Sequence, residues 1–282
     1  MNRKILITGA RGFLGSTLML VLPKFGFEPI GFEGDIRDAE SAQRQLNERA
    51  PTWVIHTAAK IDVGWCEKNQ EEATSVNVDG TRSIVHAAKS SGVPVLFVST
   101  TLVFSGEEGN YKEEDPVKPL NHYSRTKVEG EHIVQEGKGT VVRLTLLGTH
   151  PSGVRGKNFF EWVASSAEEN KDLRLFNDQF VNQISNWSAA DFFARILQLP
   201  QSEATLHIGS RDMLSKADIA KMILNHYPNY QGKLETVSVD SVGDGLYRPK
   251  QMWLNTDKAE SLFGPMPQTE EELQKIWNNH QP

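Results

Sequence analysis

The chain is poor in cysteine: Cys66 is the only one among its 282 residues. An intrachain disulfide is therefore impossible, and the cysteine content does not point to an oxidising compartment. Long apolar runs are also missing, because no uninterrupted stretch approaches the ~18 residues that a membrane-spanning helix needs. No charged and apolar leader pattern precedes the first strand-like residues, so we expect no secretory signal and a cytoplasmic protein.

The sequence also lacks clusters of basic residues. The formal net charge is −6, and no segment is rich in lysine and arginine, which argues against nucleic acids and anionic membranes as partners. The eight histidines show no spacing typical of metal ligands, so no metal site is predicted. The remaining composition is that of an ordinary globular protein, with 38% hydrophobic and 23% charged residues. The chain is long enough for one large domain or two coupled domains.

Residues 1–148 alternate between short apolar runs and helical patterns. The apolar runs are rich in β-branched residues and bounded by glycine, proline or polar residues, as is typical of buried parallel strands. They cover residues 4–8, 28–32, 53–57, 93–99 and 140–145, and the helical patterns cover residues 12–23, 39–49, 71–90 and 122–136. This alternation predicts an α/β fold with a Rossmann-type doubly wound parallel sheet, in which ligands bind beyond the carboxyl ends of the strands.

Three glycines lie between the first predicted strand and the first predicted helix. Gly9 permits a tight turn, Gly12 lets backbone approach a pyrophosphate, and Gly15 lets the helix pack closely on the strand. The helix then presents free N–H groups and a partial positive charge to the phosphates. In this position the pattern predicts a site for NAD(H) or NADP(H) rather than a glycine-rich turn without a ligand. The predicted loop also contains Arg11, Phe13 and Leu14.

The residues after the second predicted strand bear on the choice between the two cofactors. Glu33 lies where an acid would accept a hydrogen bond from the 2′-hydroxyl of the adenosine ribose, which favours NAD. Arg11 could instead contact a 2′-phosphate, so the preference for NAD is slight. Asp35 and Ile36 are suited to flank the adenine, with Asp35 accepting from its exocyclic amine. Asp38 can serve as a helix N-cap at the same time.

Tyr123 and Lys127 are four residues apart, which on a helix places them one turn apart on the same face. The spacing alone is weak evidence, but the pair opens the helix that follows the fourth strand, at the cofactor edge of the sheet. Acid–base chemistry near neutrality requires the tyrosine pKa to fall by about three units, and an ammonium ~4 Å away has an effect of that size. Thr100 can hydrogen-bond a substrate oxygen. The alternative is a surface tyrosine with a solvated lysine.

The pattern is looser in the second half. Helical patterns cover residues 158–170, 188–199, 215–227 and 269–278, a turn-rich loop is predicted at 151–156, and strands are predicted at 173–176 and 205–208. We therefore predict an NAD(P)-binding domain in residues 1–148. Residues 149–282 are predicted to form mainly a smaller, partly discontinuous substrate-binding region, with a segment near 186–210 returning to the Rossmann sheet.

With these motifs the chain resembles the extended short-chain dehydrogenase/reductases, and within them the dTDP-4-dehydrorhamnose reductases. The resemblance spans nearly the whole chain and is carried by residues 8–15, 56–60, 77–81, 99–104, 119–127, 156–159, 178–180 and 248–249. It implies hydride transfer from a nicotinamide to a sugar C4 carbonyl, with Thr100, Tyr123 and Lys127 as the catalytic set and Tyr123 protonating the developing alkoxide. Further cofactor contacts that it implies are Ala58, Ala59, Lys60, Asn77, Ser99, Tyr123 and Lys127.

The substrate residues implied by this resemblance are Thr101, Asn158 and Arg248. The alternatives for the last two are a helix-capping asparagine and an arginine paired at the surface. Two segments depart from the family pattern: residues 100–102 read Thr-Thr-Leu where these reductases have Thr-Asp-Tyr, and residues 180–185 lack the usual small-residue and Pro-Thr pattern. Both lie where substrate would be recognised, so the sugar and the nucleotide stay open.

The sequence thus predicts an NAD(P)H-dependent reductase of a nucleotide-linked 4-keto sugar. The expected ligand is a nucleotide-sugar substrate, and the protein could form a homodimer. A sugar-nucleotide epimerase and a non-catalytic regulatory NAD(P)-binding protein are the alternatives. Dehydration would need a carboxylate just after the strand-end threonine, and Thr101 occupies that place.

Overall fold

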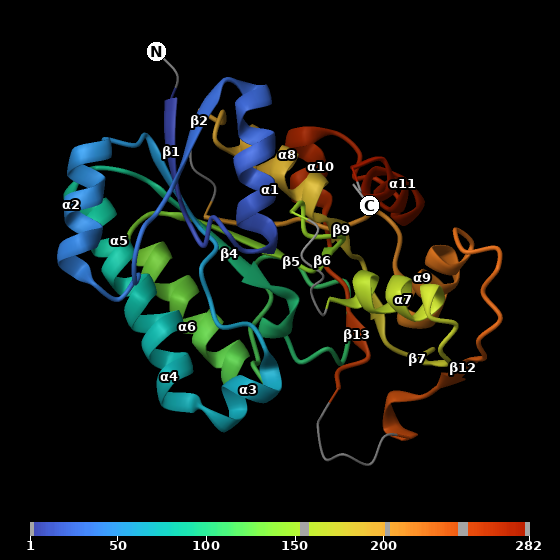
Figure 1. Ribbon diagram of the computed structural model, residues 1–282. Helices are drawn as coiled ribbons and strands as arrows, with labels where there is room; N and C mark the ends of the chain where they lie inside the picture. The colour runs from blue at the N-terminus through green and yellow to red at the C-terminus, as the bar shows by residue number, and fades with distance from the viewer. Residues whose placement is uncertain (1–2, 153–157, 201–203, 242–247, 280–282) are drawn as a thin grey trace. The chain divides into compact units, whose positions relative to one another are not determined.

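The computed structural model describes residues 3–152, 158–200, 204–241 and 248–279 (Figure 1). Its contacts define two compact units, which are described separately. Unit 1 consists of residues 1–103, 116–143 and 190–206, and unit 2 consists of residues 104–115, 144–189 and 207–282. The proposed functional division near residue 148 stays a prediction. Most of the predicted loop at 151–156 and the first two residues of the 156–159 segment lie outside the described residues.

Unit 1 contains a six-stranded sheet in the order β10-β5-β4-β3-β1-β2. The strands are β1 (Arg3–Thr8), β2 (Phe27–Gly31), β3 (Trp53–His56), β4 (Val95–Thr100), β5 (Thr140–Leu144) and β10 (Thr205–His207). The β1–β2, β1–β3 and β3–β4 pairs are all parallel. The predicted Rossmann-type α/β fold is therefore confirmed.

The strand order reverses beside β1. The chain moves outward from β1 to β2 and then returns past β1 to β3, so right-handed crossovers place α1 (Phe13–Val21) and α2 (Ala39–Arg49) on opposite faces of the sheet (Figure 1). Thr8 and His56, which end β1 and β3, are paired neighbours in the sheet. Ligands of open α/β sheets bind at such a reversal point, beyond the carboxyl ends of the strands.

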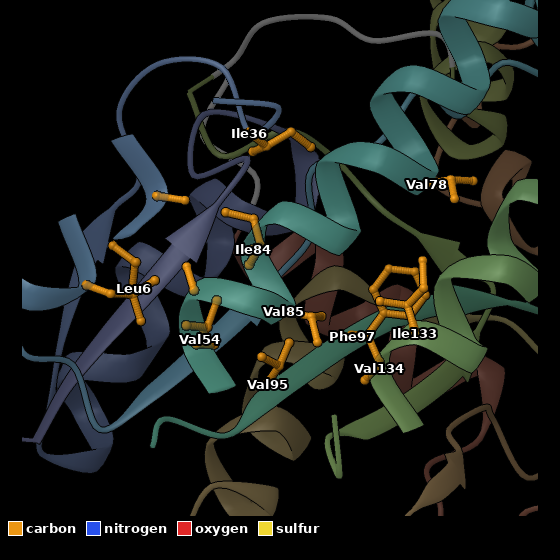
Figure 2. Close-up of a cluster of buried hydrophobic side chains, with 14 of the residues drawn as sticks. Leu6, Ile36, Val54, Val78, Ile84, Val85, Val95, Phe97, Ile133 and Val134 are labelled. Atoms are coloured by element: carbon orange, nitrogen blue, oxygen red, sulfur yellow. The ribbon is translucent and has the colours of Figure 1, made fainter. Parts of the chain in front are cut away.

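A buried aliphatic layer joins this sheet to α5 (Gly80–Ser90) and α6 (His122–Glu136). Figure 2 shows Leu6, Val54 and Val95 of the strands directed toward Ile84 of α5, with Val134 approaching from α6. Burying one such side chain fully contributes about 1.5–3 kcal/mol. The layer fixes α6, which bears Tyr123 and Lys127, and α5, which follows the π-helical turn with Asn77, against the strands.

The helix predicted at residues 71–90 is a composite. It consists of α4 (Gln70–Thr74), a π-helical turn (Ser75–Asp79) and α5. A preceding helix, α3 (Val63–Lys68), was not predicted, because six residues carry too little periodicity to stand out. Its start is fixed by Asp62, whose carboxylate accepts from Trp65 N at 2.6 Å. Asp38 caps α2 by accepting from Ser41 N at 2.9 Å, as predicted.

Unit 2 is built from helices and very short strands. The helices are α7 (Phe159–Glu168), α9 (Lys216–Leu224), α10 (Asp257–Phe263) and α11 (Thr269–Asn279), together with the first residues of α8 (Asn186–Ile196), which ends in unit 1. The strands are β6 (Leu146–Leu147), β7 (Leu173–Phe176), β8 (Phe180–Val181), β9 (Ile184–Ser185), β11 (Leu214–Ser215), β12 (Leu234–Val237) and β13 (Gln251–Met252). They pair as β11-β8-β13, β12-β7 and β6-β9.

A buried carboxylate anchors the carboxyl-terminal helix of unit 2. Glu272 on α11 accepts from Ser185 N at 2.5 Å and from Ser188 Oγ at 2.6 Å. It thereby ties α11 to the residue before α8 and to a side chain in the first turn of α8. Within the described residues, no helix has the length and apolar character needed to cross a membrane.

Candidate active site

The loop after β1 requires glycine at two positions. Gly9 has a φ of 68°, and a Cβ there would lie 2.8 Å from Thr57 Oγ1 and 2.9 Å from Ala58 N. A Cβ on Gly15 would lie 2.1 Å from Gly9 O. The first glycine therefore allows the turn and its contact with the β3 loop, and the second allows α1 to pack against that turn.

The amino terminus of α1 is suited to an anion. Its N-cap is Gly12, which offers no capping side chain, and the first turn contains no acidic residue. The N–H groups of the first turn therefore keep the partial positive charge that a helix start presents. A narrow glycine turn beside this helix start fits the pyrophosphate of a nicotinamide dinucleotide.

A buried histidine links the ends of β1 and β3. His56 Nδ1 lies 2.6 Å from Thr8 Oγ1, and its Nε2 lies 3.0 Å from Thr81 Oγ1. Thr81 Oγ1 donates its proton to Asn77 O at 2.6 Å, so His56 must donate from Nε2 and accept at Nδ1. Burial, together with the charge of Lys127, lowers the pKa of His56 to about 3, and the ring stays neutral.

Asn77, a predicted cofactor residue, supports the loop after β3. Its Oδ1 accepts from Lys60 N at 2.7 Å, and its Nδ2 donates to Lys60 O at 2.9 Å and to Thr126 Oγ1 at 3.0 Å. The two hydrogen bonds to the Lys60 backbone fix the chain directly after Ala58 and Ala59. The side chain comes from the π-helical turn, a local geometry that often marks functional segments.

The residues predicted to read the adenosine are exposed and ion-paired. Glu33 Oε1 lies 2.9 Å from Arg49 Nη2, and the Glu33 side chain is 79% exposed. Gln45 holds the Glu33 backbone by accepting from its N at 3.0 Å and donating to its O at 2.7 Å. The Asp35 carboxylate is engaged by Arg37, whose hydrogen bonds lower the pKa of Asp35. Surface ion pairs contribute only about 0–1 kcal/mol, so such a pair as Glu33–Arg49 can open to a ligand.

The remaining predicted cofactor residues of this region differ in exposure. Ile36 is buried, and its Cδ1 would lie 2.6 Å from a Cβ on Gly80, so α5 approaches it closely. Leu14 is buried, Phe13 is half-buried, and Arg11 is exposed. Arg11 is therefore accessible to a ligand phosphate.

The predicted catalytic residues come together at the end of β4 and the start of α6. The exposed fractions of Thr100, Tyr123 and Lys127 are 8%, 8% and 4%. The side chain of Thr100 hydrogen-bonds Tyr123, and the ammonium of Lys127 lies 3.8 Å from the ring centroid of Phe97. The alternative of a surface tyrosine with a solvated lysine is excluded by this burial.

The electrostatics of this trio differ from the expectation. Burial raises the pKa of Tyr123, and the hydrogen bond from Thr100 lowers it only in part. Burial also lowers the pKa of Lys127 to about 7, against the opposing charge of Glu131. The expected lowering of the tyrosine pKa is therefore wrong for the protein alone. The reason is that desolvation of the phenolate outweighs the hydrogen bond with Thr100, and the nearby Cys66 raises the Tyr123 pKa further.

Ser99 and Thr101 flank Thr100, and both are buried. Ser99 Oγ hydrogen-bonds the carboxylate of Glu131, which is also ion-paired with Arg143. The predicted cofactor residue Ser99 thus directs its hydroxyl into the protein. Glu131 and Arg143 were missed in the sequence because burial of a charged residue leaves no trace in composition or spacing.

The two predicted substrate residues of unit 2 have local partners. Asn158 caps α7 by accepting from Glu161 N at 3.1 Å, and its Nδ2 donates to Glu161 Oε2 at 2.6 Å. The guanidinium of Arg248 lies 5.7 Å from the ring centroid of Phe176. The capping alternative therefore describes the local role of Asn158, while a ligand contact of either residue stays a prediction.

Lys216 is a cation that the sequence did not single out. It is half-buried at the start of α9, and its ammonium lies 4.2 Å from the ring centroid of Phe159. Burial lowers its pKa to about 8. Among the described residues it forms no ion pair, which leaves its charge available to an anionic ligand. The described part of the chain contains no cluster of three or more histidine, cysteine, aspartate or glutamate residues suited to a metal ion.

Comparison with known proteins gives a consistent set of relatives. Residues 3–281 match the family described as the RmlD substrate binding domain. A probable low-salt glycan biosynthesis reductase of Haloferax volcanii is 28% identical, with 95% of each chain covered. Methionine adenosyltransferase 2 subunit beta of Bos taurus is 24% identical over 93% of this chain and 83% of its own. The crystal structure of dTDP-4-dehydrorhamnose reductase from Bacillus anthracis in complex with NADP superposes with a TM-score of 0.91 at 26% identity, covering 99% of this chain and 100% of that one.

Proposed function

The chain belongs to the RmlD substrate binding domain family, and from this premise we propose that it is an NAD(P)H-dependent reductase of a nucleotide-linked 4-keto sugar. The observation that carries the proposal is the buried trio of Thr100, Tyr123 and Lys127. It lies at the carboxyl end of β4, in the same parallel sheet as the glycine loop of β1. The names of the Haloferax and Bacillus relatives support a reductase of this class.

The glycine loop and the first turn of α1 would hold the pyrophosphate of the cofactor. The loop after β3, fixed by Asn77, would line its nicotinamide ribose, and Glu33 would meet its adenosine ribose. A bound nicotinamide dinucleotide supplies the hydride. The exposed Glu33 carboxylate supports a slight preference for NAD, whereas the relative solved with NADP and the exposed Arg11 leave NADP open.

The trio would transfer the proton to the sugar oxygen. Thr100 orients the sugar carbonyl oxygen toward the phenol of Tyr123, and Tyr123 donates its proton to that oxygen as negative charge develops there. Because burial raises the pKa of Tyr123, the phenol is fully protonated before reduction begins. The Lys127 ammonium then stabilises the phenolate that remains. A raised tyrosine pKa therefore suits the reducing direction.

Unit 2 supplies cations for a nucleotide sugar. Lys216, with its partly desolvated charge, and Arg248 are suited to the diphosphate of such a substrate. Thr101 in unit 1 would contact the sugar. It replaces an acid in the family pattern, and dehydration would lack its carboxylate here.

The proposal is tested with purified protein, candidate 4-keto sugar nucleotides, and NADH or NADPH. We expect consumption of reduced cofactor that depends on the sugar. Tyr123→Phe should lower kcat at least about tenfold, because it removes the proton donor. Tyr230→Phe removes a phenol whose hydroxyl donates to Lys171 O at 2.9 Å, and it should leave kcat unchanged. Normal turnover by Tyr123→Phe would disprove the mechanism.

A non-catalytic regulatory NAD(P)-binding role is the second candidate, favoured by the similarity to methionine adenosyltransferase 2 subunit beta. It predicts cofactor binding without turnover of any keto-sugar nucleotide. Thermal stabilisation by NADH or NADPH, at about 2.7 kcal/mol for a hundredfold excess over Kd, would then occur without reductase activity. An epimerase would instead retain its cofactor and convert sugars without net oxidation.

A further inference from the structure

A buried ion pair lies behind the candidate catalytic residues. Glu131 on α6 and Arg143 on β5 have side chains only 3% and 5% exposed. Arg143 Nη2 donates to Glu131 Oε2 at 2.7 Å, and Arg143 Nε donates to Glu131 Oε1 at 3.0 Å. Ser99 Oγ donates to the same Oε1. Burying such a pair rarely adds stability over apolar packing, so its presence calls for another explanation.

The pair touches both elements that carry the trio. Tyr123, Lys127 and Glu131 follow one another at intervals of four residues on α6, so they line one face of the helix. Ser99, which bonds Glu131, directly precedes Thr100 on β4. Glu131 is therefore connected to the trio through α6 and through β4.

The surroundings of Lys127 are mostly uncharged. Among the described residues, the groups of neighbouring elements that contact or influence this part of α6 include His56 of β3, Cys66 of α3, Phe97 of β4 and Arg143 of β5. His56 is neutral, Cys66 is a buried thiol with a raised pKa, and Glu67 pairs with Arg125 on the exposed side of the helix. Glu131 is thus the acid whose charge acts on Lys127.

Glu131 acts on Lys127 without binding it. Within the described residues, the ion pair of Glu131 is with Arg143, and Lys127 has none. The ammonium of Lys127 instead rests on the face of Phe97. Its hydrogen-bond donors are therefore not consumed by a carboxylate, yet a negative charge one helical turn away favours its protonated form.

We propose that Glu131, clamped by Arg143 and Ser99, is a positioning residue that favours the ammonium form of Lys127 beside Tyr123. Arg143 and Ser99 bind the carboxylate and prevent it from swinging onto Lys127. The inference rests on the proposed reductase function, since only there does the Lys127 charge stabilise the phenolate of Tyr123.

The protonation state of Lys127 can be measured without turnover. Full-length protein labelled with carbon-13 lysine is titrated by NMR, with and without NADH, and the Lys127 signal is assigned from its loss in Lys127→Met. In Glu131→Gln the titration midpoint of Lys127 should fall by about one pH unit. The matched control is Glu129→Gln, an exposed glutamate on the same helix, which should not shift the midpoint.

The kinetic counterpart is the pH profile of reduction. In Glu131→Gln the loss of kcat at alkaline pH should begin about one unit lower than in the wild type, and activity should recover toward acidic pH. Glu131→Asp, which keeps the charge, should restore most of the profile. A merely structural role would lower activity at all pH values equally.

The double variant Glu131→Gln/Arg143→Met covers the case in which Glu131→Gln does not fold. It removes both charges together and should shift the Lys127 midpoint in the same direction by a smaller amount. An unchanged Lys127 midpoint in whichever of the two variants folds overturns the proposal. Absence of any reductase activity in the wild type would instead overturn the proposed function, while the NMR shift would still report on Glu131.

Discussion

The two ends of the candidate cofactor site are built in opposite ways. Around Tyr123 and Lys127 the titratable groups are buried, and desolvation is the dominant influence on their pKa values. Around Glu33 and Asp35 the carboxylates are exposed and paired with arginines. A change of charge should therefore cost much free energy at the buried end and little at the exposed end. We therefore expect substitutions at the buried end to have large effects and those at the adenosine end to have small ones.

The largest effect on stability is expected when one partner of the buried ion pair is removed. Arg143→Leu leaves the Glu131 carboxylate buried without a counter-ion, which should lower the free energy of unfolding by about 3–5 kcal/mol. Urea denaturation measures this change. Glu131→Leu/Arg143→Leu should recover most of the loss, and a single variant as stable as the wild type would show that the pair does not need both partners.

The glycine loop should be the next most sensitive feature. Gly15→Ala places a Cβ 2.1 Å from Gly9 O, so α1 must move away from the turn. We expect about 2–3 kcal/mol lower stability and at least about tenfold weaker NADH binding. Gly26→Ala is a control for a glycine with φ of 77° but open space around its Cβ, and it should affect cofactor binding little. Equal binding by Gly15→Ala would contradict the assigned packing.

The pH dependence of reduction tests the buried end directly. The proposed mechanism needs Lys127 protonated, and the pKa of Lys127 is lowered to about 7, so kcat/KM should fall about tenfold per pH unit above that value. Tyr123 should cause no further change of kcat/KM in this pH range, because its pKa is raised and the phenol keeps its proton. Lys127→Arg should be slower but flat over this range, since a guanidinium stays charged. A wild-type profile that is flat to pH 9 would refute the assignment.

How far the sequence could predict this site depends on the kind of feature. Gly9, Gly15, Tyr123 and Lys127 were recognisable because backbone geometry and helical spacing are local properties of the chain. The pairing of Glu131 with Arg143 was not, because it joins a helix to a strand and depends on tertiary burial. For the same reason the direction of the Tyr123 pKa was predicted wrongly.

The fold shows the same division. The long strands and helices of unit 1 were predicted closely, and α2 and α6 have the predicted bounds. The two-residue strands β8, β11 and β13 of unit 2 were not predicted, since an alternating pattern cannot be seen in two residues. Their position is fixed by partners far away in sequence, such as Met252 opposite Val181.

The smallest effects are expected in unit 2 and at the adenosine end. Lys216→Met should raise KM for the nucleotide sugar several-fold, to about tenfold, and leave kcat unchanged, because it removes a charge that would meet the diphosphate. Lys221→Met, an exposed lysine of the same helix that pairs with Asp218, is the matched control. A fall in kcat without a change in KM would contradict a binding role.

At the adenosine end, Glu33→Gln should leave the melting temperature near that of the wild type, because the carboxylate is largely exposed. It should raise KM for NADH relative to NADPH by up to about tenfold. Unchanged discrimination between the two cofactors would remove Glu33 from the ribose site.

The π-helical turn at Ser75–Asp79 also sets the phase between two helices. Each residue of an α-helix advances the chain by about 100° around the axis, so one additional residue in the turn rotates everything after it by that angle relative to α4. Ala73 before the turn and Ile84 after it are both buried with this offset in place. Shortening the segment by one residue would rotate one of these faces toward solvent and withdraw Asn77 from Lys60. The length of this segment is thus as tightly constrained as its composition.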